Sequence, residues 1–357
     1  MSRADILIAG GGPAGLATAI AASRRGFSVT VIDGRRPPID KACGEGLMPE
    51  ALEALARLGV SIPAEESFPF RGVRFIGSQG VSAAADFPSG CGLGVRRTTL
   101  HRALVDQAER AGVDLRWGEA IKPEGFHARW IIGADGGGSQ VRKWAGLDVF
   151  SRDSRRFGFR RHYRLTSLSD RLEIYWGRGF QIYVTPVAPE EICVALLTRD
   201  SRLRLDDALH ACPSLAALLA HSTPMSTERG AETATRRLHA VYRDRVALVG
   251  DASGSVDAIS GSGLSLAFQH SFALVDAMER DNLSQYAAAH RRILRRPAFM
   301  SDFMLTMDRW PLLETRAMRV FAKRPQIFAR LLAMHVGQLP SLNFAAASLD
   351  LAWRMLL

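Results

Sequence analysis

A glycine-rich turn close to the N-terminus constrains the fold of this 357-residue chain more than any other feature. Gly10, Gly12 and Gly15 match the pattern GxGxxG, between an apolar stretch at 6–9 and a segment at 14–25 that is typical of a helix. In a strand–turn–helix unit of this kind the first glycine permits a tight turn. The second lets the backbone approach a pyrophosphate, and the third allows close packing of helix on strand. Free N–H groups at the helix start then favour phosphate binding.

The residues after this turn complete a βαβ unit. A second apolar stretch at 28–32 ends at Asp33, where a carboxylate can accept hydrogen bonds from the ribose of an adenosine. We therefore expect a dinucleotide-binding lobe built on a parallel sheet. The further contacts expected around the same turn and strand end are Pro13, Ala14, Gly34 and Arg35.

The pattern changes in the middle of the chain. Segments at 173–176, 181–185 and 192–197 are rich in aromatic and β-branched residues and predict an antiparallel sheet. An apolar strand returns at 245–249, and helical patterns run from about 261 onward. The sequence thus predicts an α/β protein with a discontinuous dinucleotide lobe at 1–150 and 236–285. We expect an inserted substrate lobe at 151–235 and a helical C-terminal region at 286–357.

Composition excludes several classes of protein. The four cysteines show no metal-ligand spacing, so we expect neither a metal site nor a disulfide framework. No apolar stretch reaches the ~20 residues of a membrane span, and we expect a cytoplasmic protein. The formal charge of +10 attracts anions, but no nucleic-acid-binding motif is present, and we expect no nucleic-acid partner.

Two later segments point to one family. Gly133-Ala134-Asp135-Gly136, with Ser139, Val141 and Arg142, resembles the GADG-x-x-S-x-V-R segment of flavin hydroxylases. Gly250-Asp251-Ala252 resembles a later segment of the same group. In this order and spacing, the three segments are similar to those of the para-hydroxybenzoate hydroxylase superfamily. The resemblance covers roughly 4–146 and 236–280, and implies a Rossmann-like lobe that binds FAD.

The resemblance also implies site residues. Asp251 would bond a hydroxyl of the ribityl chain, and Gly261 and Gly263 would open a helix beneath the pyrimidine ring of the flavin. Arg97 matches an arginine that lies near the cofactor in this superfamily, or is a surface residue at a helix start. The remaining implied cofactor contacts are Asp135, Gly136, Gly250 and Leu264.

Within the superfamily, Lys41-Ala42-Cys43-Gly44-Glu45-Gly46-Leu47 is similar to a segment of the geranylgeranyl reductase branch, which would place Cys43 and Gly44 beside the flavin ring. The chain departs from that branch at Ala258 and Ser262, where the branch has Pro and Glu. It also keeps only part of the branch's aromatic segment, at 181–186.

Catalytic candidates are few. Cys43 has a redox or gating role, or is a small buried cysteine. Glu45 is an acid–base group or a helix-start carboxylate. Asp257 either has a functional role, in which it positions substrate or relays a proton, or caps a turn. We regard His162 as structural. The expected walls of the substrate pocket are Tyr175, Tyr183, Thr185 and Pro186.

The C-terminal region from about Arg309 interleaves apolar and basic residues. This spacing fits helices packed with a solvated outer face. It also fits a peripheral contact with a membrane or a carrier protein.

These observations together predict an FAD-dependent oxidoreductase for a hydrophobic small molecule. Without a second GxGxxG in the chain, we expect NADH or NADPH to act as a transient electron donor. A monooxygenase of an aromatic or polyketide-type ring is favoured. The alternatives are a geranylgeranyl reductase-like enzyme that reduces carbon–carbon double bonds, and a flavin-binding sensor or partner protein without turnover.

Overall fold

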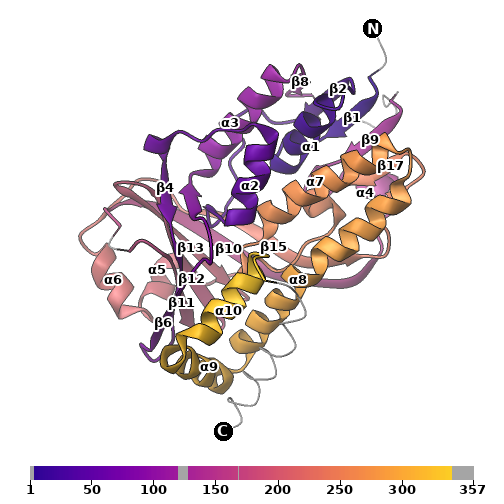
Figure 1. Cartoon of the computed structure of the whole chain (residues 1–357). Helices are drawn as coiled ribbons and strands as arrows, with labels where there is room; N and C mark the ends of the chain where they lie inside the picture. The colour runs from indigo at the N-terminus through magenta and orange to yellow at the C-terminus, as the bar shows by residue number, and fades with distance from the viewer. Residues whose placement is uncertain (1–3, 120–127, 168, 340–357) are drawn as a thin grey trace.

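The computed structural model describes residues 4–119, 128–167 and 169–339 (Figure 1). Within these ranges, no helix is both long and apolar enough to cross a membrane. The fold is α/β, with a dinucleotide lobe, a large second sheet and C-terminal helices, as the sequence predicts.

The first sheet holds the dinucleotide lobe together. Its order is β16-β17-β9-β1-β2-β8, and β1 pairs in parallel with both β2 and β9. Helices α1 (Pro13–Ser23), α3 (Arg97–Arg110) and α7 (Gly263–Glu279) pack together beside it. The strands are β1 (Ile6–Ala9), β2 (Val29–Asp33), β8 (Asp114–Trp117), β9 (Trp130–Gly133), β16 (Tyr242–Arg243) and β17 (Val246–Leu248). Because parallel strands end at the same edge, the turns after β1, β2, β9 and β17 gather there.

The second sheet has eight strands and is mainly antiparallel. Its order is β14-β10-β13-β12-β11-β5-β6, and β15 pairs with β10. The strands are β5 (Gly72–Ile76), β6 (Ser82–Asp86), β10 (Phe150–Arg164), β11 (Leu172–Gly177), β12 (Phe180–Ala188), β13 (Glu191–Thr198), β14 (Thr223–Pro224) and β15 (Arg229–Leu238). Helices α5 (Leu205–Leu209) and α6 (Pro213–Leu219) share a core with strands of this sheet.

One part of this sheet comes from a segment assigned by sequence to the dinucleotide lobe. β5 and β6 form an antiparallel hairpin, but β5 also pairs in parallel with β11. A hairpin pattern does not reveal which sheet its outer edge joins, so the boundary at 150 separates strands that lie together in space.

Smaller elements connect the two sheets. Strands β3 (Gly46–Leu47), β4 (Ser67–Phe70) and β7 (Gly92–Val95) form a three-stranded sheet. The other short elements are α2 (Pro49–Leu58), η1 (Ala64–Glu66) and α4 (Gln140–Trp144).

The C-terminal helices cover one end of the second sheet. They are α8 (Leu283–Arg309), α9 (Pro311–Lys323) and α10 (Pro325–His335), and both α9 and α10 contact β6 (Figure 1, orange to yellow). Most of the apolar stripe of this region packs in a core cluster with the sheet. Trp310 and Leu312 stay exposed, and a membrane or carrier contact through them stays a proposal.

Candidate active site

A cavity of about 870 Å³ lies between the dinucleotide lobe, the second sheet and the C-terminal helices. Its volume falls within the range of roughly 300–1,000 Å³ that small-molecule sites occupy. One end is lined by the glycine turn and polar loops, and the other by apolar side chains. We call the end lined by the glycine turn the glycine end, and the end lined by apolar side chains the apolar end.

The glycine turn is packed too closely to accept side chains at two of its three positions. Gly10 has a φ of +112°, and a Cβ there would lie 2.4 Å from the carbonyl oxygen of Ala134. A Cβ at Gly15 would lie 1.9 Å from the carbonyl oxygen of Gly10, so this glycine serves packing and does not line the cavity. At Gly12 no atom of the described residues lies within 4 Å of a Cβ added there. The open space there is where a pyrophosphate can meet the backbone.

Asp33 closes the turn at the end of β2. Its Oδ2 accepts a hydrogen bond from the N–H of Gly11 at 2.8 Å, and its Oδ1 accepts one from the N–H of Arg35 at 2.8 Å. A carboxylate offers about four acceptor positions, so two stay available to ribose hydroxyls. Gly34 does not line the cavity, whereas Asp33 and Arg35 do.

Asp251 and Lys41 meet across the glycine end. Asp251 lies in the short helix η3 (Gly250–Ser253) after β17, and its Oδ2 is 3.0 Å from Nζ of Lys41. The Lys41 ammonium lowers the pKa of Asp251 against the opposing effect of burial. Asp251 is therefore ionised, and its second carboxylate oxygen is an acceptor for a hydroxyl such as those of a ribityl chain.

Two unpartnered polar atoms mark this end as a ligand site. Nε of Arg97 and Oδ1 of Asp135 are buried without a hydrogen-bond partner among the described residues, and both residues line the cavity. The other oxygen of Asp135 accepts hydrogen bonds from the N–H groups of Gln140 and Val141 at the start of α4. Such groups rarely stay unpaired in a native protein. The Nε–H of Arg97 can donate to a phosphate or ring oxygen of FAD, and Oδ1 of Asp135 can accept from a hydroxyl or N–H group of FAD.

Residues at the start of α7 also line the glycine end. Gly261, Gly263 and Leu264 line the cavity, and Gly261 adopts a φ of +66° at the end of η4 (Ala258–Ser260). The helix N-terminus carries partial positive charge toward this space. Asp257 lies outside the lining: it accepts from the N–H of Ile259 at 3.0 Å and pairs with buried Arg156 at 3.1 Å. It thus acts as a cap, which was one of its two interpretations.

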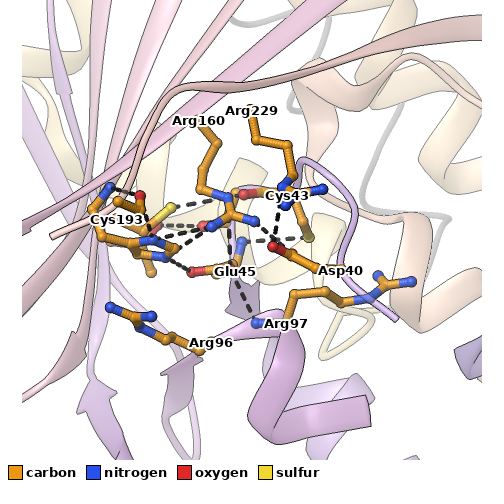
Figure 2. A network of polar contacts seen from close by, with 12 residues as sticks. Asp40, Cys43, Glu45, Arg96, Arg97, Arg160, Cys193 and Arg229 are labelled. Atoms are coloured by element: carbon orange, nitrogen blue, oxygen red, sulfur yellow. Dashed lines mark hydrogen bonds and ion pairs between the residues drawn. The ribbon is translucent and has the colours of Figure 1, made fainter. Parts of the chain in front are cut away.

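Glu45 belongs to a buried network of hydrogen bonds and ion pairs (Figure 2). Its Oε2 lies 2.6 Å from Nε2 of His162, and its Oε1 accepts from the N–H of Arg97 at 3.0 Å. Nε of Arg160 is 3.9 Å from Oε1. Burial acts to raise the pKa of Glu45, but the hydrogen bond and charge of His162, with the charge of Arg160, bring it below its usual range. The carboxylate is ionised and ties its loop to β10.

Glu45, His162 and Cys193 also place their donor atoms within 4.8 Å of one another. The guanidinium of Arg160 contacts His162 at 3.0 Å and lies beside Glu45. A cation at this point would meet that positive charge, so we assign no metal to this cluster. Cys43, in the same loop, lines the cavity and is partly exposed.

The apolar end is walled by strands on one side and by helices on the other. The lining side chains are Val73, Phe75, Leu172, Ile174, Tyr183, Met300, Phe303, Met304, Phe321, Phe328, Leu331, Leu332 and His335. The hydroxyl of Tyr183 donates to the carbonyl of Ile259 at 2.6 Å and so joins the sheet to η4.

Of the four residues predicted to wall the substrate pocket, Tyr183 lines the cavity and three do not. Tyr175 pairs with Ile182 in the ladder and packs in the core beneath α5 and α6. Side chains alternate along a strand, so Tyr175 faces away from Tyr183. Thr185 donates to the carbonyl of Gly44 at 2.8 Å, and the carbonyl of Pro186 fills the space beside Gly94.

Most of the predicted cofactor residues come together at the glycine end. Those that line it are Gly10, Gly12, Pro13, Ala14, Asp33, Arg35, Cys43, Gly44, Arg97, Asp135, Gly136, Gly250, Asp251, Gly261, Gly263 and Leu264. Sequence reasoning missed Lys41, His335 and the walls from β5, α8 and α10. The apolar stripe of the C-terminal region was the available signal for those helices.

Comparisons with known proteins agree with this geometry. The family described as "FAD binding domain" matches residues 3–124. A menaquinone reductase of Mycolicibacterium smegmatis is 43% identical over 76 residues, 21% of this chain and 19% of that protein. A rifampicin monooxygenase of Rhodococcus hoagii is 28% identical over 165 residues, 41% of this chain and 34% of that protein. The matches thus span about a fifth to a third of these relatives.

Similarity of fold covers a larger share of the chain than similarity of sequence. The crystal structure of a flavoprotein/dehydrogenase from Cytophaga hutchinsonii superposes with a TM-score of 0.78 and covers 94% of this chain and 92% of that chain, at 21% identity. FAD is the cofactor that the sequence motifs, the geometry of the glycine end and these matches indicate together. Residues 3–124 thus form an FAD-binding domain, and the chain is similar to flavoproteins of the para-hydroxybenzoate hydroxylase superfamily.

Proposed function

We propose that this protein is an FAD-dependent monooxygenase that hydroxylates an electron-rich ring of a hydrophobic molecule, with NADH or NADPH as transient electron donor. The observation that carries the proposal is the continuity of the cavity: the glycine end and the apolar end form a single space. A substrate held among the apolar side chains can therefore reach a flavin held by the glycine turn.

The chain's own residues supply orientation and environment. The start of α7, at Gly263 and Leu264, would stabilise negative charge that develops on a bound flavin. The side chains of Met300, Met304 and Phe328 exclude water from the apolar end, which limits wasteful side reactions. FAD, when bound, supplies the oxidation–reduction chemistry.

The similarity to a rifampicin monooxygenase supports oxygen insertion as the reaction. Its 28% identity extends over 165 residues, a longer stretch than the flavin turn alone.

A second candidate is reduction of carbon–carbon double bonds in a prenyl or polyene chain. The 43% identity to a menaquinone reductase favours it, and the apolar end also suits a prenyl chain. FAD held at the glycine end would supply the hydride for this reaction, which needs no dioxygen.

The two reactions differ in their need for dioxygen. We would reduce the FAD-loaded protein anaerobically with NADPH, and then add either a long-chain phenol or a polyprenyl compound. Monooxygenation predicts that the visible absorbance of the flavin returns only after dioxygen is admitted, together with a hydroxylated phenol. Anaerobic return of that absorbance with the polyprenyl compound establishes the reductase instead. A protein that binds FAD but never oxidises NADH or NADPH in steady state is a sensor or partner protein.

A further inference from the structure

The corner between α8 and α9 exposes two large apolar side chains next to a cation. Leu312 is 81% exposed and Trp310 is 58% exposed, more than any other large apolar side chain of the described residues. The guanidinium of Arg309 lies over the ring of Trp310, 5.9 Å from its centroid. Single exposed apolar residues are ordinary on soluble proteins, so the residues around this pair decide what it means.

Leu312 begins a stripe along α9 whose other members are cations. Arg316, Arg319 and Lys323 follow it at intervals of three or four residues, so the four lie on one face of the helix. All four are exposed, and we call them the outer stripe. The opposite face of α9 is buried, and Phe321 on that face lines the apolar end of the cavity. One helix thus separates the outer stripe from the substrate space.

The positive charge of these helices is not neutralised by their own carboxylates. Residues 283–335 carry ten cationic side chains and three carboxylates, so they hold seven of the ten net positive charges of the chain. Each carboxylate is engaged by a residue outside the helices: Asp302 pairs with Arg152, Asp308 pairs with Arg199, and Glu314 accepts from Ser78. Arg319 donates to the neutral side chain of Gln79, and neither Arg319 nor Lys323 forms an ion pair with another described residue. The outer stripe therefore presents charge that attracts anions.

Exposed apolar side chains bordered by cations suit the surface of an anionic lipid bilayer. Tryptophan rings favour the level of the headgroups, and basic side chains are attracted to anionic lipids. An acidic protein would satisfy the cations as well, but a bilayer also explains the position of the cavity. Because a helix is about 10 Å across, α9 resting on a bilayer would hold the apolar end close to the lipid. Figure 1 shows α9 at the end of the molecule opposite the dinucleotide lobe.

We propose that Arg309, Trp310 and the outer stripe bind the surface of an anionic lipid bilayer. Trp310 and Leu312 enter the headgroup boundary, and the cations contact the lipid phosphates. An apolar molecule dissolved in the bilayer then has a short path to the apolar end. The proposal goes beyond the proposed function and holds for either reaction, since binding to lipid requires no turnover.

Sedimentation with vesicles tests this surface. Full-length FAD-loaded protein is mixed with vesicles of phosphatidylcholine alone, or with vesicles in which one quarter of the lipid is phosphatidylglycerol. The bound fraction is measured at low and at high salt. We expect binding to the anionic vesicles only, and release by salt, because dissolved ions screen exposed charges.

Variants locate the binding on α9. Arg319→Gln/Lys323→Gln should weaken vesicle binding about 25-fold, because each cation near an anionic surface contributes about fivefold. Leu312→Ser should weaken it about 10-fold, through loss of one buried apolar side chain. The matched control is Arg110→Gln/Arg280→Gln, which removes two exposed arginines of the dinucleotide lobe that also donate to glutamines. The control should bind vesicles as wild type does. All variants should retain the visible absorbance of bound FAD, which shows that they are folded.

Wild-type protein that stays in the supernatant with anionic vesicles overturns the proposal, as does undiminished binding in the two α9 variants. Equal losses in the control would show that net charge alone attracts the vesicles, and would overturn it too. Binding of the same residues to an acidic acyl carrier protein, without binding to vesicles, identifies the other partner and has the same consequence.

The outcome is separable from the proposed reaction. Vesicle binding that depends on α9, in a protein that turns over no probe, contradicts the proposed function alone. Turnover by a protein that binds no vesicles contradicts only this inference.

Discussion

Nε2 of His162 lies 2.6 Å from Oε2 of Glu45, and both side chains are almost completely buried. The contact joins the loop that carries Cys43 and Gly44, at the glycine end of the cavity, to β10 of the second sheet. Glu45 itself adopts a positive φ of 59°, which a non-glycine residue keeps only when its surroundings hold it there. This buried pair therefore positions the loop at the glycine end of the cavity.

Replacing Glu45 by Gln should destabilise the fold by about 3 kcal/mol, because it leaves buried His162 without its anionic partner. Arg160 keeps its ion pair with Asp40. The loss should depend on pH. The folded pKa of Glu45 lies below its ordinary value, so its contribution is complete above that ordinary value and disappears as pH falls through the folded pKa. Urea unfolding of wild type and Glu45→Gln at neutral and acid pH measures this difference, which should shrink in acid.

Glu279→Gln is the matched control, since Glu279 pairs with Arg25 at the surface. Exposed ion pairs contribute about 0–1 kcal/mol. Equal effects of the two substitutions at neutral pH would show that the buried network does not hold the loop.

The glycine turn predicts opposite results for two alanine substitutions. Gly10→Ala should unfold the dinucleotide lobe, because its Cβ would lie 2.4 Å from a carbonyl oxygen. The methyl group of Gly12→Ala meets no atom of the described part of the chain within 4 Å, so the protein should stay folded, but this group should weaken FAD binding at least 10-fold. Thermal unfolding and FAD titration separate the two. Full FAD affinity in Gly12→Ala rules out pyrophosphate binding at this position.

The sequence predicts the glycine end well because local rules determine it. A few neighbouring residues are enough to identify each of its parts: the turn at Gly10, the acidic strand end at Asp33 and the helix start at Gly263. The parallel sheet then brings these segments to one edge. No long-range contact has to be known to place them together.

The apolar end depends on contacts that are distant in sequence. Phe75 reaches it because β5 pairs with β11, almost a hundred residues later in the chain. His335 reaches it because α10 folds back over that sheet. A single sequence contains no local signal for such pairings, and Tyr175 was assigned to the wrong face because its alternation with Tyr183 depends on the register between two strands.

Arg97 should be needed for FAD binding, whereas its neighbour Arg96 should not. Arg97 lines the cavity with its Nε unpartnered, and Figure 2 shows its side chain extending away from Glu45. Arg96 instead pairs with Glu191. Arg97→Met should raise the Kd for FAD about 10-fold or more, as expected for loss of a charged hydrogen bond. Arg96→Met should leave it unchanged, and equal FAD affinities for both variants would contradict the assignment.

Met304→Trp should narrow the apolar end and discriminate between substrates by length. Binding of pentadecylphenol should weaken about 10-fold, because the larger ring occupies space among Phe328 and Leu331. Phenol itself should bind as before. Leu312→Trp, on the exposed surface, serves as the control. If chain length makes no difference in Met304→Trp, the apolar end does not hold the substrate chain.

The origin of the oxygen atom in the product tests the central claim most directly. FAD-loaded protein would turn over pentadecylphenol with NADPH under dioxygen labelled with the heavy isotope, and the product would be weighed by mass spectrometry. Monooxygenation predicts a hydroxylated product with one labelled oxygen atom. A product without the label, or reduction of a polyprenyl compound in the absence of dioxygen, would contradict it.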